Sequence, residues 1–283
     1  GIYAEAFAIP TSKVKALGVP RTDALFDWER KRKTREALYE KYPFLRDQKI
    51  ILFAPTFRGD GNKDAHYPQE AFDLDAFLEK MPEDTACIIK HHPFVHQPVE
   101  IPARWQNRAL DLTGKDHIND LLLITDLLIT DYSSSIFEAA ILEVPMLFYA
   151  FDEEEYMASR DFYFAYEEMV PGPVAKTFRE LCRRASRMVS GQWNPVDEPW
   201  IFGEDADGAR RPDADHPDDE CAETDLLTRR MERFREAFLS ALDGHSTERV
   251  AAYIKENYLK NVPESTADAA ADAESGRRWK NEE

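Results

Sequence analysis

Short apolar runs alternate along this chain with segments of helical spacing, and this alternation constrains the fold more than any other feature of the sequence. Four runs are apolar at nearly every position, at residues 50–54, 86–90, 127–130 and 146–149. Continuous runs of this length are typical of strands buried on both faces of a sheet. Helical spacing marks residues 29–41, 74–81, 118–124, 135–142 and 177–189, followed later by 225–242 and 246–259. The pattern predicts an α/β fold with a parallel, doubly wound, Rossmann-like sheet.

The composition fits a globular protein with a sizeable core. Of the 283 residues, 43% are hydrophobic and 12% aromatic, and no apolar run is long enough to span a bilayer. The N-terminus has neither the basic start nor the apolar core of a signal peptide. Three cysteines without C-x-x-C spacing predict neither a disulfide framework nor a structural zinc site. We therefore expect a cytoplasmic protein, peripheral at the inner face of the cell membrane if it contacts one.

The net charge of −18 is concentrated in one segment. Residues 193–225 contain 12 acidic and two basic residues, so this stretch carries −10 of the total. It is also rich in Pro, Gly and Ala and has no strand or helix period, which predicts a disordered insert; residues 261–283 predict a disordered tail. The net charge of −18 argues against a nucleic-acid-binding surface, because neutralising phosphates requires clustered Lys and Arg, so no nucleic-acid partner is expected.

Polar residues follow three of the predicted strands directly. The first is followed by Pro-Thr-Phe-Arg-Gly-Asp at 55–60, the second by His-His-Pro-Phe at 91–94, and the third by Asp-Tyr-Ser-Ser-Ser at 131–135. Ligands of open α/β sheets bind beyond the carboxyl ends of the strands, so these segments are expected to converge on one cleft.

The third of these segments has two interpretations. A strand that passes through hydroxyl residues into a helix presents backbone N–H groups and a helix dipole, which favour phosphate binding. Alternatively, Ser135 and Glu138 have the spacing of a capping box, which needs no ligand. Ser133 and Ser134 are not needed for such a cap, so both interpretations stay open.

Two histidines and two arginines are further candidates for phosphate binding. Pro93 biases His92 toward an extended conformation, so its ring is expected to project over the cleft. Adjacent residues on a strand point to opposite faces, so His91 is expected to lie in the core or in solvent. No third zinc ligand lies near the pair in sequence, which disfavours a metal site. Arg58 and Arg160 each carry a guanidinium that suits a bidentate contact with phosphate.

These segments resemble the CDP-glycerol glycerophosphotransferase family, the polymerases and primases of teichoic acid synthesis. The matching pieces occur in the family's order: GVPRTD at 18–23, APTFR at 54–58, KHHPF at 90–94, INDLL at 118–122, ITDYSS at 129–134, FYF at 162–164 and PGP at 171–173. Together they cover roughly residues 15–190. An apolar residue is more usual where His91 stands, and the acidic insert has no obvious counterpart in the family.

The resemblance implies a GT-B architecture, in which two Rossmann-like domains face each other across a cleft. The chain resembles the C-terminal, donor-binding half. By this resemblance, residues 1–20 correspond to the crossover from an N-terminal acceptor domain missing from this sequence. Residues 21–260 then form the donor-nucleotide-binding domain, interrupted by the insert at 193–225 and followed by the tail at 261–283.

The resemblance also implies roles for individual residues. His92 and Arg58 are the expected catalytic residues, which stabilise the leaving CMP and the phosphate oxygens. Ser133 and Ser134 are expected at the pyrophosphate, and Glu138 at the ribose. The complete expected donor-binding set is Thr56, Asp131, Ser133, Ser134, Ser135, Glu138 and Arg160.

The implied reaction transfers glycerol phosphate from CDP-glycerol to a lipid-linked teichoic acid or related acceptor and releases CMP. No metal ion or other cofactor is expected, because the strand-end segments contain no Asp-x-Asp pair. Two alternatives remain: a CDP-ribitol or nucleotide-sugar donor in the same fold, and a non-catalytic nucleotide-binding domain that pairs with a separate acceptor subunit. The chain alone is expected to bind the donor without turnover, and any membrane contact is expected through the acceptor half or a partner.

Overall fold

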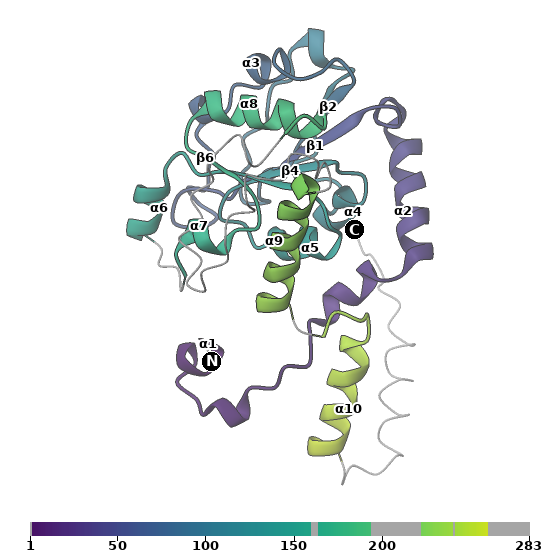
Figure 1. The fold of residues 1–283 in the computed structure, drawn as a ribbon, viewed down its shortest axis with the longest axis vertical. Helices are drawn as coiled ribbons and strands as arrows, with labels where there is room; N and C mark the ends of the chain where they lie inside the picture. Colours follow the sequence, from purple (N-terminus) through teal and green to yellow (C-terminus); the bar gives the residue numbers. More distant parts are fainter. Residues whose placement is uncertain (1, 160–163, 194–221, 240, 260–283) are drawn as a thin grey trace, which may run out of the picture.

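The computed structural model describes residues 2–159, 164–193, 222–239 and 241–259 (Figure 1). Its strands are β1 (Lys49–Phe53), β2 (Thr85–Ile89), β3 (Ala109–Asp111), β4 (Leu127–Thr130), β5 (Met146–Tyr149) and β6 (Val174–Ala175). Its α-helices are α1 (Ile2–Ala6), α2 (Trp28–Lys41), α3 (Leu74–Leu78), α4 (Ile118–Leu122), α5 (Ser135–Ile141), α6 (Glu153–Ser159), α7 (Tyr166–Met169), α8 (Phe178–Val189), α9 (Ala222–Phe238) and α10 (Ser246–Tyr258). The short 3-10 helices are η1 (Thr11–Lys13), η2 (Pro20–Leu25), η3 (Pro43–Leu45), η4 (Gln69–Ala71) and η5 (Ala103–Trp105).

All six strands form one parallel sheet in the order β3-β2-β1-β4-β5-β6. Each of the four apolar runs identified in the sequence is a strand of this sheet. The register places Ile51 of β1 between Cys87 of β2 and Leu127 of β4. The strand order reverses between β1 and β4, which makes this the doubly wound arrangement. The predicted α/β fold class is confirmed.

Helices cover both faces of the sheet because successive strand residues point to opposite sides. Ile50 and Leu52 belong to a core shared with α2, α4, α5 and α9, whereas Ile51 and Phe53 belong to a second core shared with α3 and α8. Figure 1 shows α8 and α9 on opposite sides of the sheet. All four of these β1 side chains are at most 1% exposed, so the continuous apolar run is explained by burial on both faces.

The predicted helices are present, with ends that differ by up to four residues. α9 begins at Ala222 rather than at residue 225, so the last residues of the acidic stretch 193–225 are helical. Residues 194–221 of that stretch and the predicted tail lie outside the described residues. The sequence patterns missed α1, β3, β6, α6 and α7, which have only two to seven residues each.

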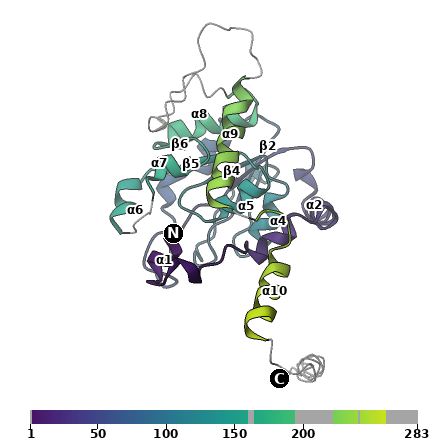
Figure 2. The same cartoon turned by 60° about the horizontal axis from the view of Figure 1, so that its bottom comes forward.

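A close approach joins the N-terminal segment to α10. The carboxylate of Asp23 in η2 accepts hydrogen bonds from the backbone N–H groups of Ser246 (3.0 Å) and Thr247 (2.7 Å), the first residues of α10. Gly18, with φ +88°, lies so close that an added Cβ would clash with the Ser246 hydroxyl oxygen. A side chain is therefore excluded at residue 18. Figure 2 shows α10 extending away from the sheet from this attachment point.

Two further findings concern the described cysteines and helices. Cys87 and Cys182 are buried free thiols. Among the described helices, none combines the length and hydrophobicity needed to cross a bilayer.

Candidate functional site

A cleft of about 720 Å³ lies at the carboxyl edge of the sheet, where the strand order reverses. Loops that follow four adjacent strands line it, because parallel strands end at the same edge. The loop after β1 contributes residues 54–57, the loop after β2 residues 90–93, the loop after β3 residues 114–117, and the β4–α5 junction residues 132–135. Arg21, Ile118, Asn119 and Glu138 complete the lining. The three strand-end segments singled out in the sequence thus meet at one place.

Asp131 ties the end of β4 to the end of β1. Its side chain is fully buried, and Oδ1 accepts hydrogen bonds from the backbone N–H groups of Thr56 and Tyr132, both at 2.7 Å. Burial raises the pKa of this carboxyl, and the positive charge of Arg58 opposes that shift. Asp131 therefore fixes the loop that presents Thr56 to the cleft.

Arg58 lies behind the cleft wall, between two carboxylates. Its guanidinium contacts Asp152 through Nε (2.5 Å) and Nη2 (2.9 Å), and Nη2 lies 3.0 Å from Asp131 Oδ2. Nη1 donates to the carbonyl oxygen of Thr56 at 2.7 Å. The Arg58 side chain is 12% exposed and is not among the residues that line the cleft. The sequence analysis placed Arg58 at the donor phosphates, whereas here it stabilises the strand-end loops.

His91 and His92 have different surroundings, as the alternation along a strand predicts. The His91 residue is 7% exposed, and its ring stacks on Tyr67 at 5.3 Å and meets the edge of Phe53 at 6.2 Å. Burial lowers its pKa. His92 is half-buried in the cleft, with its ring 4.8 Å from that of Phe57. Both histidines touch the cleft, but His91 is almost entirely buried in the core, whereas His92 is half-exposed to the cleft.

His92 is oriented by the turn that follows it. Its Nδ1 accepts a hydrogen bond from the backbone N–H of Phe94 at 3.2 Å, which leaves Nε2 as the atom available to a ligand. Burial lowers the pKa of His92, which favours the neutral form of the ring. A phosphate beside the ring would favour its protonated form and raise that pKa again.

Among the three serines after β4, Ser133 and Ser135 are joined by hydrogen bonds. Ser133 Oγ lies 2.9 Å from Ser135 Oγ and accepts a hydrogen bond from the Ser135 backbone N–H at 3.2 Å. α5 has Ser134 as its N-cap, and no side-chain cap hydrogen bond is found there among the described residues. The capping box of Ser135 and Glu138 is thus not formed. Ser134 is exposed, Ser133 is half-buried and both line the cleft.

Glu138 forms an ion pair instead of a cap. Its carboxylate lies 2.7 Å from Nη2 of Arg21, a residue of η2. The Glu138 side chain is 5% exposed, whereas that of Arg21 is 64% exposed. Both residues line the cleft, so this pair joins the N-terminal segment to α5 at the cleft edge.

Four basic residues of the cleft had no role assigned from the sequence: Arg21, Lys90, Lys115 and His117. Lys90 is 8% exposed, and its Nζ donates to the carbonyl oxygens of Leu112 (3.0 Å) and Lys115 (3.3 Å). Burial lowers the pKa of Lys90. Lys115 and His117 follow β3, whose three residues are too few for a periodic signal. Lys90 is the last residue of the apolar run 86–90. A basic residue at the end of a buried strand was the feature of the sequence that could have identified it as a cleft residue.

Two further expectations concern Arg160 and metal binding. Arg160 lies outside the described residues, so the structure gives it no position. Within the described residues, no three or more His, Cys, Asp or Glu side chains are grouped to hold a metal ion.

Curated relatives of this chain are enzymes of teichoic acid synthesis. The teichoic acid poly(ribitol-phosphate) polymerase of Bacillus spizizenii is 47% identical over 179 residues, covering 63% of this chain and 29% of that protein. The ribitol-phosphate primase of the same species is 33% identical, covering 89% of this chain and 55% of that protein. The poly(glycerol phosphate) polymerase of Bacillus subtilis is 33% identical, covering 67% of this chain and 25% of that protein. The chain therefore spans between a quarter and about half of the length of these relatives.

A solved structure and a family model agree with these relatives. The wall teichoic acid polymerase TagF, in a crystal soaked with CDPG, matches 93% of this chain and 56% of its own, with a TM-score of 0.68 and 22% identity. At this identity the likeness establishes the fold. The model of the CDP-glycerol:poly(glycerophosphate) glycerophosphotransferases matches residues 1–194, and the resemblance seen in the sequence is thereby confirmed: this chain belongs to that family.

Proposed function

We propose that this chain binds the nucleotide donor of a polyol-phosphate transferase of teichoic acid synthesis. In the proposed reaction, a hydroxyl oxygen of a lipid-linked acceptor forms a bond to the β-phosphorus of a CDP-polyol, the bond to the bridging oxygen breaks, and CMP leaves. The hydroxyl proton passes to a base, for which we look to the acceptor-binding part of such enzymes. Since that acceptor is carried on a lipid, we also propose that the reaction takes place at the inner face of the cell membrane.

The observation that carries this proposal is the concentration of basic side chains in the cleft of an acidic protein. The chain has a net charge of −18, yet Lys90, Lys115, His92 and His117 all line this cleft. Two acidic residues also line the cleft, and each is paired with a cation: Glu138 with Arg21 and Asp116 with Lys41. A pyrophosphate suits such a site, because its charge is stabilised in a partly buried, positive environment.

Within this site we propose distinct roles for the predicted residues. His92 contacts a donor phosphate through Nε2, and the hydroxyls of Ser133 and Ser134 donate to the pyrophosphate. Thr56 forms the facing wall, and Glu138 accepts from the ribose hydroxyls. Arg58, Asp131 and Ser135 act indirectly, because they hold these groups in position.

We propose CDP-ribitol as the donor ahead of the CDP-glycerol expected from the sequence. Relatives named as ribitol-phosphate polymerases are 47%, 43% and 42% identical, compared with 33% for the Bacillus subtilis poly(glycerol phosphate) polymerase. CDP-glycerol remains the second candidate, because the matching family model is described by that substrate.

Titration calorimetry with matched nucleotides tests the proposed donor. We expect CDP-ribitol to bind about tenfold more tightly than UDP or ADP, a difference of about 1.4 kcal/mol. CDP-glycerol in the same experiment separates the two polyols. Equal affinity for cytidine and uridine ligands would contradict the proposal. A donor that binds but supports no transfer after an acceptor domain is supplied would favour a non-catalytic binding domain.

The two neighbouring histidines provide a matched pair of variants. His92→Ala is expected to weaken CDP-ribitol binding by about 10- to 150-fold, because a hydrogen bond to a charged group contributes roughly 1.5–3 kcal/mol. His91→Ala is expected to lower the free energy of unfolding by about 2–5 kcal/mol, as truncation of a large core side chain does. Urea unfolding and donor titration of both variants separate these effects. A larger loss of donor affinity in a folded His91→Ala protein would reverse the assignment.

A further inference from the structure

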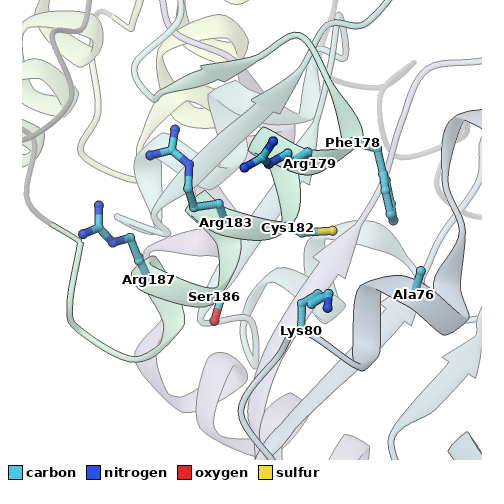
Figure 3. Close-up of a pocket in the computed structure, with 8 residues that line it drawn as sticks. All are labelled: Ala76, Lys80, Phe178, Arg179, Cys182, Arg183, Ser186 and Arg187. Atoms are coloured by element: carbon cyan, nitrogen blue, oxygen red, sulfur yellow. The ribbon is translucent and has the colours of Figure 1, made fainter.

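A second groove lies on the face of the sheet covered by α3 and α8 (Figure 3). It has a volume of about 530 Å³. Figure 3 shows Ala76 and Lys80 on one side, facing Phe178 and Cys182 of α8. Burial raises the pKa of Cys182 to about 11, so this thiol stays neutral and adds apolar surface. The floor of the groove is thus apolar, and Lys80 adds a positive charge at its rim.

Three arginines of α8 line the same groove and share one side of the helix. Arg179, Arg183 and Arg187 are four residues apart, a spacing that places side chains above one another on a helix. Figure 3 shows the three side chains projecting from the same side of α8. The twelve residues of α8 include four arginines and one acidic residue, in a chain with a net charge of −18. The groove is therefore a local positive site on an acidic protein.

Four acidic residues in or next to α3 and α8 have partners of their own. Arg104 forms ion pairs with Asp75 and Glu79, the latter at 2.7 Å. Asp73 caps α3 by accepting from the Ala76 backbone N–H, and Glu180 accepts from the Lys176 backbone N–H at 2.9 Å. Asp75 and Glu79 of the α3 segment are thus paired with Arg104, a residue outside the groove.

We propose that this groove binds the polyol-phosphate polymer itself, as a second site apart from the donor cleft; this inference rests on the proposed function. Residues four apart on a helix are about 6 Å apart along its axis. Consecutive phosphates of an extended polyol-phosphate chain are roughly 7–10 Å apart, for three to five carbons joined by bonds of about 1.5 Å. Poly(ribitol phosphate), with five carbons per unit, is at the upper end of this range when fully extended. A partly bent polymer, together with arginine side chains that spread along the helix axis, lets three successive phosphates each meet one guanidinium.

The course of α8 gives the bound polymer a direction. β6 ends at the same edge of the sheet as the strands that border the cleft, and α8 begins three residues later. Arg179 is therefore the nearest of the three arginines to that edge, and Arg187 the farthest. A polymer that reaches the cleft is held along α8 with its phosphates in register with these residues. Arg183 and Arg187 also take part in other interactions within the chain, so the polymer competes for them.

The test measures binding of end-labelled, purified poly(ribitol phosphate) to the complete 283-residue chain by fluorescence anisotropy at low salt. Replacing Arg179, Arg183 and Arg187 together with Gln is expected to weaken binding about tenfold, the combined effect of three exposed ion pairs. Arg179→Gln and Lys80→Gln, tested singly, are expected to weaken it two- to threefold each. These single variants keep the inference testable if the triple variant does not fold. Added salt at about 0.5 M is expected to abolish the difference.

A second triple variant controls for the loss of charge alone. α2 is also basic, but its cations occupy consecutive positions that point around the helix. Replacing the consecutive residues Arg30, Lys31 and Arg32 with Gln removes the same charge and is expected to change polymer affinity less than twofold. Equal losses from the two triple variants would overturn the inference.

Two further measurements complete the test. The first asks whether the groove binds a membrane instead of the polymer, and the second asks whether the α8 variants still bind the donor. Vesicles containing phosphatidylglycerol supply the anionic membrane; if the α8 variant loses vesicle binding but keeps polymer binding, the inference is wrong. CDP-ribitol titration of the same variants tests the proposed function separately. If the unmodified chain binds CDP-ribitol but not the polymer, the proposed polymer site is wrong and the proposed function stands. If the unmodified chain binds neither ligand, the proposed function is wrong as well.

Discussion

Arg58→Met is expected to lower the free energy of unfolding by about 3–5 kcal/mol, the usual cost of leaving a buried charge without its partner. Arg58 lies between Asp131 and Asp152, and the Asp131 side chain is fully buried. Methionine fills much of the arginine volume, so the expected loss comes from electrostatics rather than from a cavity. Urea unfolding measures it. Arg46→Met, which removes an exposed ion pair with Glu36, is the matched control and is expected to cost no more than about 1 kcal/mol.

The loss in Arg58→Met is expected to depend on pH in a defined direction. Burial already raises the pKa of Asp131 above its ordinary value of 3.8, and removal of the guanidinium raises it further. A carboxyl with a raised folded-state pKa binds protons more readily when folded, so stability increases as pH falls through that pKa. The variant should therefore lose less stability at about pH 5 than at about pH 8. Adding Asp131→Asn to Arg58→Met should recover part of the loss, and a greater loss at low pH would contradict this account.

The chain of 283 residues is expected to bind the donor yet release CMP at a rate near background when a lipid-linked acceptor is added. The cleft is lined by loops of one sheet, and in-line attack requires that the acceptor hydroxyl be held beside the donor phosphorus. Effective molarities from such positioning reach about 10⁵–10⁸ M, or about 7–11 kcal/mol. This is the largest effect that we predict for catalysis.

A fusion protein provides the comparison for this prediction. In it, the acceptor-binding domain of a related polymerase precedes Gly1, and CMP release is measured beside the unfused chain. Donor affinity should be similar in the two proteins, because the proposed donor contacts of His92, Ser133 and Ser134 lie on this chain. Comparable turnover by both proteins would show that residues 1–283 contain an acceptor site of their own.

The sheet could be predicted from the sequence because burial on both faces leaves a strong pattern. Ile50, Ile51, Leu52 and Phe53 form an uninterrupted apolar run, and each of them is buried. β3 could not be predicted in this way, since it has three residues and only Ala109 is buried. Missing β3 also meant missing the loop that follows it, which supplies part of the cleft.

The candidate site was predictable in location but not in detail. Strand-end segments identify the cleft, because parallel strands end together, and alternation along the strand accounts for the different burial of His91 and His92. The sequence could not show that Arg58 faces two carboxylates, since Asp152 is 94 residues away in the chain. Nor could it show that Glu138 pairs with Arg21, which belongs to another element. Long-range ion pairs have no local pattern, so a lone charged residue leaves its partner undetermined.

The attachment of α10 to the N-terminal segment has a consequence for cooperative unfolding. Asp23 accepts the first two N–H groups of a helix that lies 223 residues further along the chain, and Gly18 leaves room for that helix. Fraying of α10 from its first turn would leave the Asp23 carboxylate without these partners, so the two segments open together rather than separately. Backbone amides of Ser246 and Thr247 should accordingly exchange with deuterium at the rate at which η2 detaches, well below the rate of an ordinary exposed helix end.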